Sequence, residues 1–63
     1  MKVKFIEVGR SKKTWETECE GELTYEWLYS QAKKALFSSN IDFTDDGKIY
    51  AGFHNVGRFE IVT

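Results

Sequence analysis

The two residue types most often paired as nucleophile and base, cysteine and histidine, each occur once in this chain of 63 residues. Cys19 is the only cysteine and His54 the only histidine, so one thiol–imidazole pair is the nucleophilic arrangement to consider. Cys19 falls on the same face of an alternating stretch as Trp15, and this position favours a buried, inert thiol. His54 lies beside a predicted turn and is typical of a surface histidine. The sequence therefore predicts no Cys–His catalysis.

Other motifs that carry chemistry are absent from the sequence. The serines lack a nucleophile-elbow motif, and they are Ser11, Ser30, Ser38 and Ser39. Asp45-Asp46-Gly47 lacks the ligand spacing of a calcium loop, and one cysteine with one histidine cannot form a structural zinc site. The chain also has no glycine-rich phosphate loop. We expect a protein that is not an enzyme, with no metal, no cofactor and no small-molecule substrate.

The composition limits which classes of non-enzymatic protein the chain could belong to. Nine basic and ten acidic residues give a net charge of −1, so binding to nucleic acid would require the charges to be sorted in space. Apolar residues make up 41% of the chain, with five Phe, three Tyr and two Trp, which suits one small domain over residues 1–63. The lone cysteine and the lack of a long apolar run predict a cytoplasmic protein without a membrane span.

One six-residue sequence motif, called the repeated phrase below, occurs twice. Residues 5–10 and 53–58 share the pattern Phe-x-x-Val-Gly-Arg. Each copy is expected to run from a strand into a glycine turn and to place an arginine just past the glycine, with Asn55-Val56-Gly57 forming a hairpin. The alternative is that Val-Gly-Arg is a convenient strand ending used twice by chance.

The periodicity of apolar residues predicts an α+β domain of ββαβββ order, with one helix packed on one face of a mostly antiparallel five-stranded sheet. Thr24 is the expected N-cap of a helix over residues 25–37. The apolar stripe of that helix comprises Tyr25, Leu28, Tyr29, Ala32, Ala35 and Leu36. The expected strands are residues 2–8, 14–20, a strand beginning at 41–43, 49–53 and 59–62.

Two features of the sheet are left open by the sequence. The apolar residues of the first strand change parity at Ile6, which indicates either a bulge or a strand with apolar neighbours on both faces. An all-antiparallel strand order 2-1-5-4-3 is favoured, because it makes the first and fifth strands central. The rival is a mixed order 1-2-3-4-5 with a right-handed crossover.

The predicted connectivity sorts the charges toward two ends. The end where the first strand finishes is expected to collect Arg10, Lys12, Lys13, Lys33, Lys34 and Arg58. The other end is expected to collect acidic residues, namely Glu18, Glu20, Glu22, Glu26, Asp45 and Asp46. Ordinary turn polarity and helix-end charge preferences explain the same pattern without a binding role.

Two surfaces are candidates for binding a partner. Trp27 projects away from the helix stripe, near Gln31, and either forms an exposed contact or folds back over the sheet edge. The sheet face without a helix is expected to carry Tyr50, His54, Glu60 and Val62, with Glu16 and Glu18 at its edge. Such a face meets water, pairs with a second copy or receives a partner.

Several short motifs resemble a known group of proteins. They are Ser39-x-Ile41-Asp42-Phe43, Asp45-Asp46-Gly47-x-Ile49, Gly52-Phe53, Val56-Gly57-x-Phe59-Glu60, and Val8-Gly9-Arg10 followed by Trp15. Together they resemble short uncharacterised proteins encoded by bacteriophages and prophages. The resemblance implies a cytoplasmic accessory protein and carries no catalytic residues.

The function expected from the sequence is a non-catalytic interaction module. It would bind a protein partner, or form a homodimer, through the open sheet face and Trp27, with Gln31, Tyr50 and His54 as further contacts. The alternative is nucleic-acid binding through the basic end formed by Arg10, Lys12, Lys13, Lys33, Lys34 and Arg58, with Tyr50 as a platform for a base.

Overall fold

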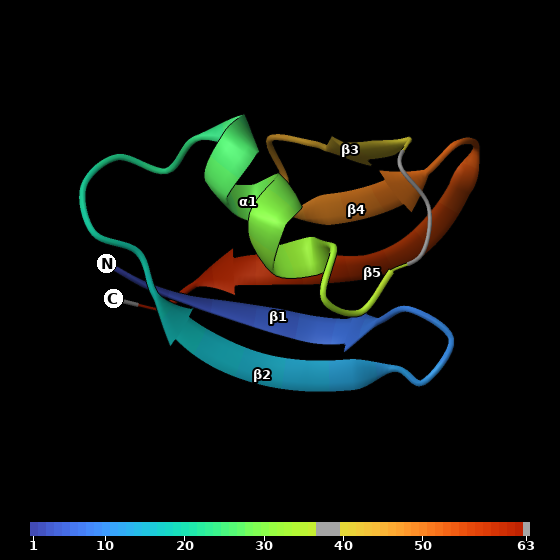
Figure 1. Cartoon of the computed structure of the whole chain (residues 1–63), viewed down its shortest axis with the longest axis horizontal. Coiled ribbons are helices and arrows are strands. Elements are labelled where there is room, and N and C mark those ends of the chain that lie inside the picture. Colours follow the sequence, from blue (N-terminus) through green and yellow to red (C-terminus); the bar gives the residue numbers. More distant parts are fainter. Residues whose placement is uncertain (37–39, 63) are drawn as a thin grey trace.

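A five-stranded antiparallel sheet and one helix form the domain in the computed structural model, which describes residues 1–36 and 40–62 (Figure 1). The strand order is β2-β1-β5-β4-β3, and every neighbouring pair is antiparallel, so the favoured order is confirmed. The elements are β1 (Lys2–Val8), β2 (Lys13–Glu18), α1 (Tyr25–Ala32), β3 (Ile41–Phe43), β4 (Lys48–Ala51) and β5 (His54–Ile61).

Helix α1 begins where the sequence predicts but ends earlier. The Thr24 side chain accepts a hydrogen bond from the Trp27 N–H at 3.2 Å and caps the helix. After Ala32 the backbone bonds tighten, because the N–H groups of Lys34 and Ala35 donate to carbonyls three residues back. The predicted end at residue 37 lies outside the described residues. Helix α1 lies over one face of the sheet (Figure 1), where Leu28 and Ala32 are buried.

The core is built on an aromatic row that crosses three strands. Phe5 is fully buried in β1, and its Cα partners are Trp15 in β2 and Phe59 in β5. The Phe5 ring stacks on Trp15 at 4.9 Å between centroids and lies 6.3 Å from Phe59. Trp27 covers the row from the helix, 6.1 Å from Phe5. The buried residues around the row are Val3, Val8, Cys19, Leu28, Ala32, Leu36, Ile41 and Ile49.

Charged residues dominate the opposite face of the sheet. The strand register places Lys4 between Glu16 and Glu60, so opposite charges face each other across neighbouring strands. An antiparallel sheet with one face on the core and one charged face is suited to water. Tyr50 and Glu60 belong to this face, as predicted, but His54 pairs with Ala51 and therefore falls on the other side.

Bulges occur in both central strands at the same end of the sheet. The parity change of β1 is a bulge: Phe5 pairs with Trp15 and Val8 with Lys13, so β1 has one extra residue, and Glu7 has φ +50°. In β5, Gly57 pairs with Ile49 and Asn55 with Tyr50, which leaves Val56 unpaired in the same way. The bulge in β1 returns Val8 to the core.

The prediction for the last hairpin is wrong. The turn is Gly52-Phe53, between the paired Ala51 and His54, and Asn55, Val56 and Gly57 lie inside β5. The sequence was misleading because a bulge that ends in glycine has the same residue pattern as a glycine turn.

The two copies of the repeated phrase lie side by side although only the first leaves a strand. The Gly9 N–H donates to the Val56 carbonyl at 2.9 Å. A Cβ on Gly57 would lie 2.9 Å from the Val8 Cα, and a Cβ on Gly9 would lie 2.4 Å from the Ala35 carbonyl oxygen. Both glycines are therefore needed for close backbone approach.

We expect Gly9→Ala to destabilise the fold much more than Gly21→Ala. Both glycines have positive φ, +81° and +88°, but a Cβ on Gly21 would meet nothing within 4 Å. Gly21→Ala should thus cost about 1 kcal/mol from backbone strain alone, and Gly9→Ala about 1–3 kcal/mol more from the clash. Urea unfolding followed by circular dichroism checks this. Equal losses would show that the contact between Gly9 and Ala35 is unimportant.

Candidate functional site

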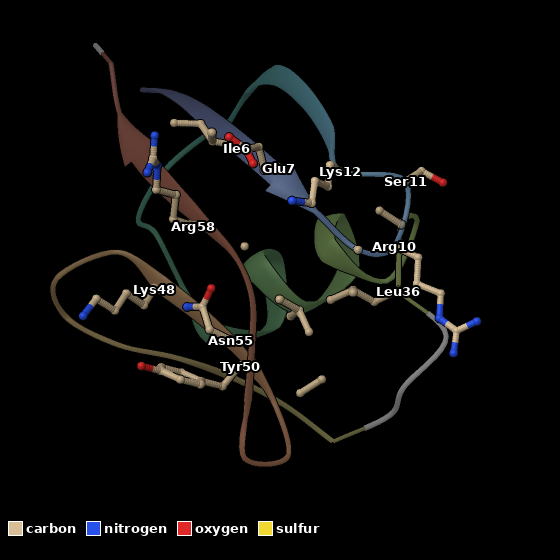
Figure 2. Close-up of a pocket in the computed structure, with 15 residues that line it drawn as sticks. Ile6, Glu7, Arg10, Ser11, Lys12, Leu36, Lys48, Tyr50, Asn55 and Arg58 are labelled. Atoms are coloured by element: carbon tan, nitrogen blue, oxygen red, sulfur yellow. The ribbon is translucent and has the colours of Figure 1, made fainter.

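A hollow lies beside the adjoining bulges of β1 and β5, at the end of the sheet where β1 finishes. Its volume is about 1070 Å³, and bulges are known to twist strands locally and to occur beside binding sites. The β1–β2 turn, β4 and the start of β5 supply most of its wall (Figure 2). The lining comprises Ile6, Glu7, Gly9, Arg10, Ser11, Lys12, Ala35, Leu36, Lys48, Tyr50, Ala51, Asn55, Val56, Gly57 and Arg58.

Positive charge distinguishes this wall from the rest of a nearly neutral protein. Four lining residues are cationic, Arg10, Lys12, Lys48 and Arg58, whereas Glu7 is the single carboxylate among them. In Figure 2, Arg10 and Lys48 stand on opposite sides of the hollow and their side chains project away from each other, so the charges lie around its rim rather than in one cluster. We call this site the basic hollow.

Three of the six predicted basic residues, Arg10, Lys12 and Arg58, line the basic hollow, and the others do not. Lys13 and Lys34 line a smaller hollow of about 430 Å³ between β2 and the helix end. Lys33 is the exposed C-cap of α1. Both hollows are lined in part by Ala35, so they adjoin each other.

Sequence reasoning missed Lys48 as a member of the basic site. Its Cα partner in β5 is Arg58, which in turn pairs with Ile6 in β1. This register follows from the bulge at Val56. No sequence signal available for a single chain places Lys48 beside Arg58, because the predicted fifth strand began at residue 59.

Strained backbone coincides with the basic hollow. Among the described residues, Glu7 and Lys12 are the non-glycine residues with positive φ, each at +50°, and both line this site. The Glu7 N–H donates to the Thr14 hydroxyl at 3.1 Å, which holds the bulge. Lys12 closes the β1–β2 turn by donating its N–H to the Gly9 carbonyl at 3.1 Å. Such conformations cost about 1–3 kcal/mol and cluster at functional sites.

Lys48 is partly neutralised by Asp46 in the β3–β4 turn. The Lys48 Nζ lies 3.7 Å from an Asp46 carboxylate oxygen. The Thr44 hydroxyl donates to the same carboxylate, and this hydrogen bond lowers the pKa of Asp46 below its usual value, with a smaller lowering by the charge of Lys48. Asp46 is therefore ionised at neutral pH and competes with any anion for Lys48.

The four predicted protein-binding residues do not share one surface. Trp27 is half-buried and packs on Phe5, so it folds back over the core, the second of the two arrangements considered for it. Gln31 lines the smaller hollow beside β2, and Tyr50 lines the basic hollow. His54 is exposed at the start of β5.

Phe53 is the exposed aromatic residue that the sequence did not indicate. It lies at the tip of the β4–β5 hairpin with a relative exposure of 101%, whereas the sequence placed it at the end of a strand. Gly52 precedes it with φ +66°, and the Gly52 N–H donates to the Asn40 carbonyl at 3.0 Å. The hairpin therefore exposes the Phe53 side chain from a backbone that this hydrogen bond fixes in place.

The one thiol–imidazole pair of the sequence is separated in the structure. Cys19 is buried beside the start of β1, where its N–H donates to the Met1 carbonyl at 2.7 Å. His54 lies at the β4–β5 hairpin, at the opposite end of the sheet (Figure 1). Ser38 and Ser39 lie outside the described residues. Within residues 1–36 and 40–62, no group of three or more His, Cys, Asp or Glu side chains could hold a metal ion.

Comparisons with protein-family models, with curated proteins and with solved structures find no match to this chain. In the part of the chain that the structure describes, no helix has the length and apolar character needed to cross a membrane.

We expect Trp27→Ala to lower the free energy of unfolding much more than Phe53→Ala does. Trp27→Ala removes a ring packed against Phe5 and should lower the free energy of unfolding by about 2 kcal/mol or more. Phe53→Ala removes a fully exposed ring and should change it by less than about 0.5 kcal/mol. Urea unfolding followed by circular dichroism measures both, and a Trp27→Ala effect as small as that of Phe53→Ala would contradict the core position of Trp27.

Proposed function

We propose that this protein is a non-catalytic interaction module that binds a protein partner, or a second copy of itself, through the β4–β5 hairpin. Phe53 carries the proposal, because its ring is fully exposed at the hairpin tip. Aromatic side chains are enriched in protein interfaces, where their rings leave water on binding. His54 and Asn55 lie beside Phe53 and would form the polar rim of the contact.

The backbone of the hairpin supports this role for Phe53. The turn is closed by the pairing of Ala51 with His54 and is held to the neighbouring segment by the hydrogen bond between Gly52 and Asn40. Because hydrogen bonds already fix the backbone of this turn, little backbone conformational entropy is lost when Phe53 binds a partner. Transfer of a phenylalanine ring into a partner pocket contributes about 2–3 kcal/mol.

The type of protein and its location are part of the same proposal. The resemblance to short phage and prophage proteins suggests an accessory protein that acts through contacts rather than catalysis. Cys19 is a free, buried thiol, and a free thiol is in keeping with the reducing cytoplasm. The separation of Cys19 from His54 is consistent with a non-catalytic role.

We expect Phe53→Ala to weaken partner binding by about 30-fold, which corresponds to about 2 kcal/mol. A photo-crosslinking phenylalanine analogue at position 53 captures the partner in a lysate of the producing cells, and the captured protein is then purified. Calorimetry with that partner measures Kd for the natural protein, Phe53→Ala and the control Ile61→Ala. Ile61 is also exposed, at 52%, but lies at the far end of β5.

Sedimentation velocity covers the case in which the partner is a second copy. A concentration-dependent dimer that Phe53→Ala abolishes and Ile61→Ala preserves would support self-association through the hairpin. The proposal fails if the protein stays monomeric and position 53 crosslinks to nothing, or if both alanine variants reduce binding equally.

A further inference from the structure

Within the described residues, the cations of the basic hollow are little compensated by carboxylates. Lys48 and Arg58 are direct cross-strand partners, a like-charge pairing that destabilises a sheet. Asp46 offsets Lys48, but Arg10, Lys12 and Arg58 form no ion pair with any residue that the structure describes. An anion held between these side chains would relieve the repulsion between Lys48 and Arg58.

The backbone conformation of Lys12 is a second observation at the same site. Position 12 has φ +50°, a conformation that glycine or asparagine adopts at lower cost than lysine. The strained position carries an exposed cation on the wall of the hollow. A residue that costs stability and supplies charge at a hollow is expected where that charge is used.

The walls also offer an aromatic ring. Tyr50 is half-buried on β4 and lines the basic hollow, and Lys48 and Arg58 line the same wall (Figure 2). Stacking of an unpaired base on an aromatic ring, with nearby cations on the phosphates, is the usual way in which proteins bind single strands. The volume of about 1070 Å³ slightly exceeds the usual range for small-molecule pockets, which is roughly 300–1000 Å³, and leaves room for more than one nucleotide.

We propose that the basic hollow binds single-stranded nucleic acid, with its phosphates between Arg10, Lys12, Lys48 and Arg58 and a base stacked on Tyr50. A net charge of −1 does not oppose this, because the cations surround the hollow while most carboxylates lie elsewhere. Phe53, the residue on which the hairpin proposal depends, is not part of the lining, although Asn55 belongs to both surfaces.

Fluorescence anisotropy with a labelled oligothymidylate of about eight nucleotides tests the proposal, because single small folds bind about 4–16 nucleotides. We expect binding that weakens with salt, with a slope of log K against log salt near −2 to −3, from about −0.7 for each of three or four phosphates. Absence of binding at low salt, or binding without salt dependence, would overturn the proposal.

The Lys12→Gly variant separates function from stability. It should weaken oligothymidylate binding about fivefold and make the salt slope shallower by about 0.7, while Tm stays the same or rises. Lys2→Gln is the matched control, since it also removes one exposed cation, but at the far end of β1. Equal losses from both variants would mean that only net charge matters, and the site would be rejected.

Tyr50 distinguishes single strands from duplexes. Tyr50→Ala should weaken oligothymidylate binding about tenfold, since stacking contributes about 1–3 kcal/mol per base, whereas Tyr50→Phe should retain it. A duplex of the same length should bind less tightly than the single strand. Tighter duplex binding, or an acidic peptide that binds as well as the oligonucleotide, would replace the proposed ligand with another.

Asp46→Asn should strengthen the binding of the oligothymidylate. It removes the charge that competes for Lys48, while the amide oxygen can still accept from the Thr44 hydroxyl. We expect binding to strengthen about twofold to threefold, and unchanged or weaker binding would exclude Lys48 from the site. Phe53→Ala should leave oligothymidylate binding unchanged, so failure of the hairpin proposal and failure of this one can be told apart.

Discussion

The packing of Phe5 is the interaction on which the rest of the structure depends. Its ring is fully buried and contacts Trp15, Trp27 and Phe59, so one side chain joins β2, β1, β5 and α1. A chain of this length buries only about 60% of its unfolded surface, and large rings remove the most area from water. The row extends from Phe59 through Phe43 to Tyr25 and Tyr29, which connects the core to β3 and the start of the helix.

Close backbone approach governs the other end of the sheet. Gly9 and Gly57 allow β1, β5 and the segment after α1 to meet where a side chain would collide with backbone atoms. The same approach brings the β1 and β5 bulges together, and Glu7, Val56 and Gly57 of these bulges line the basic hollow. The two copies of the repeated phrase therefore pack against each other, and the arginine of each copy lines the hollow.

The candidate binding features lie outside the aromatic core. Phe53 is held at a hairpin tip and the cations surround the hollow, so either surface can change without repacking Phe5.

The sheet edges are protected from unwanted strand pairing in two ways. Strand β3 has only three residues, and β2 carries Lys13, Glu16 and Glu18. These features disfavour pairing of further strands at either edge of the sheet.

The sequence alone determined the local features of this protein. Thr24 caps the helix, Asp45-Asp46-Gly47 lies in the β3–β4 turn, and the alternation in β2 places Trp15 inward, because capping, turn chemistry and strand periodicity act between near neighbours. Only the tertiary structure decided the rest. Gly57 lies in a bulge rather than a turn, Trp27 packs on Phe5, and Lys48 lies opposite Arg58. Each of these depends on the register between strands or on contact between the helix and the sheet, and those follow from packing between residues far apart in the chain.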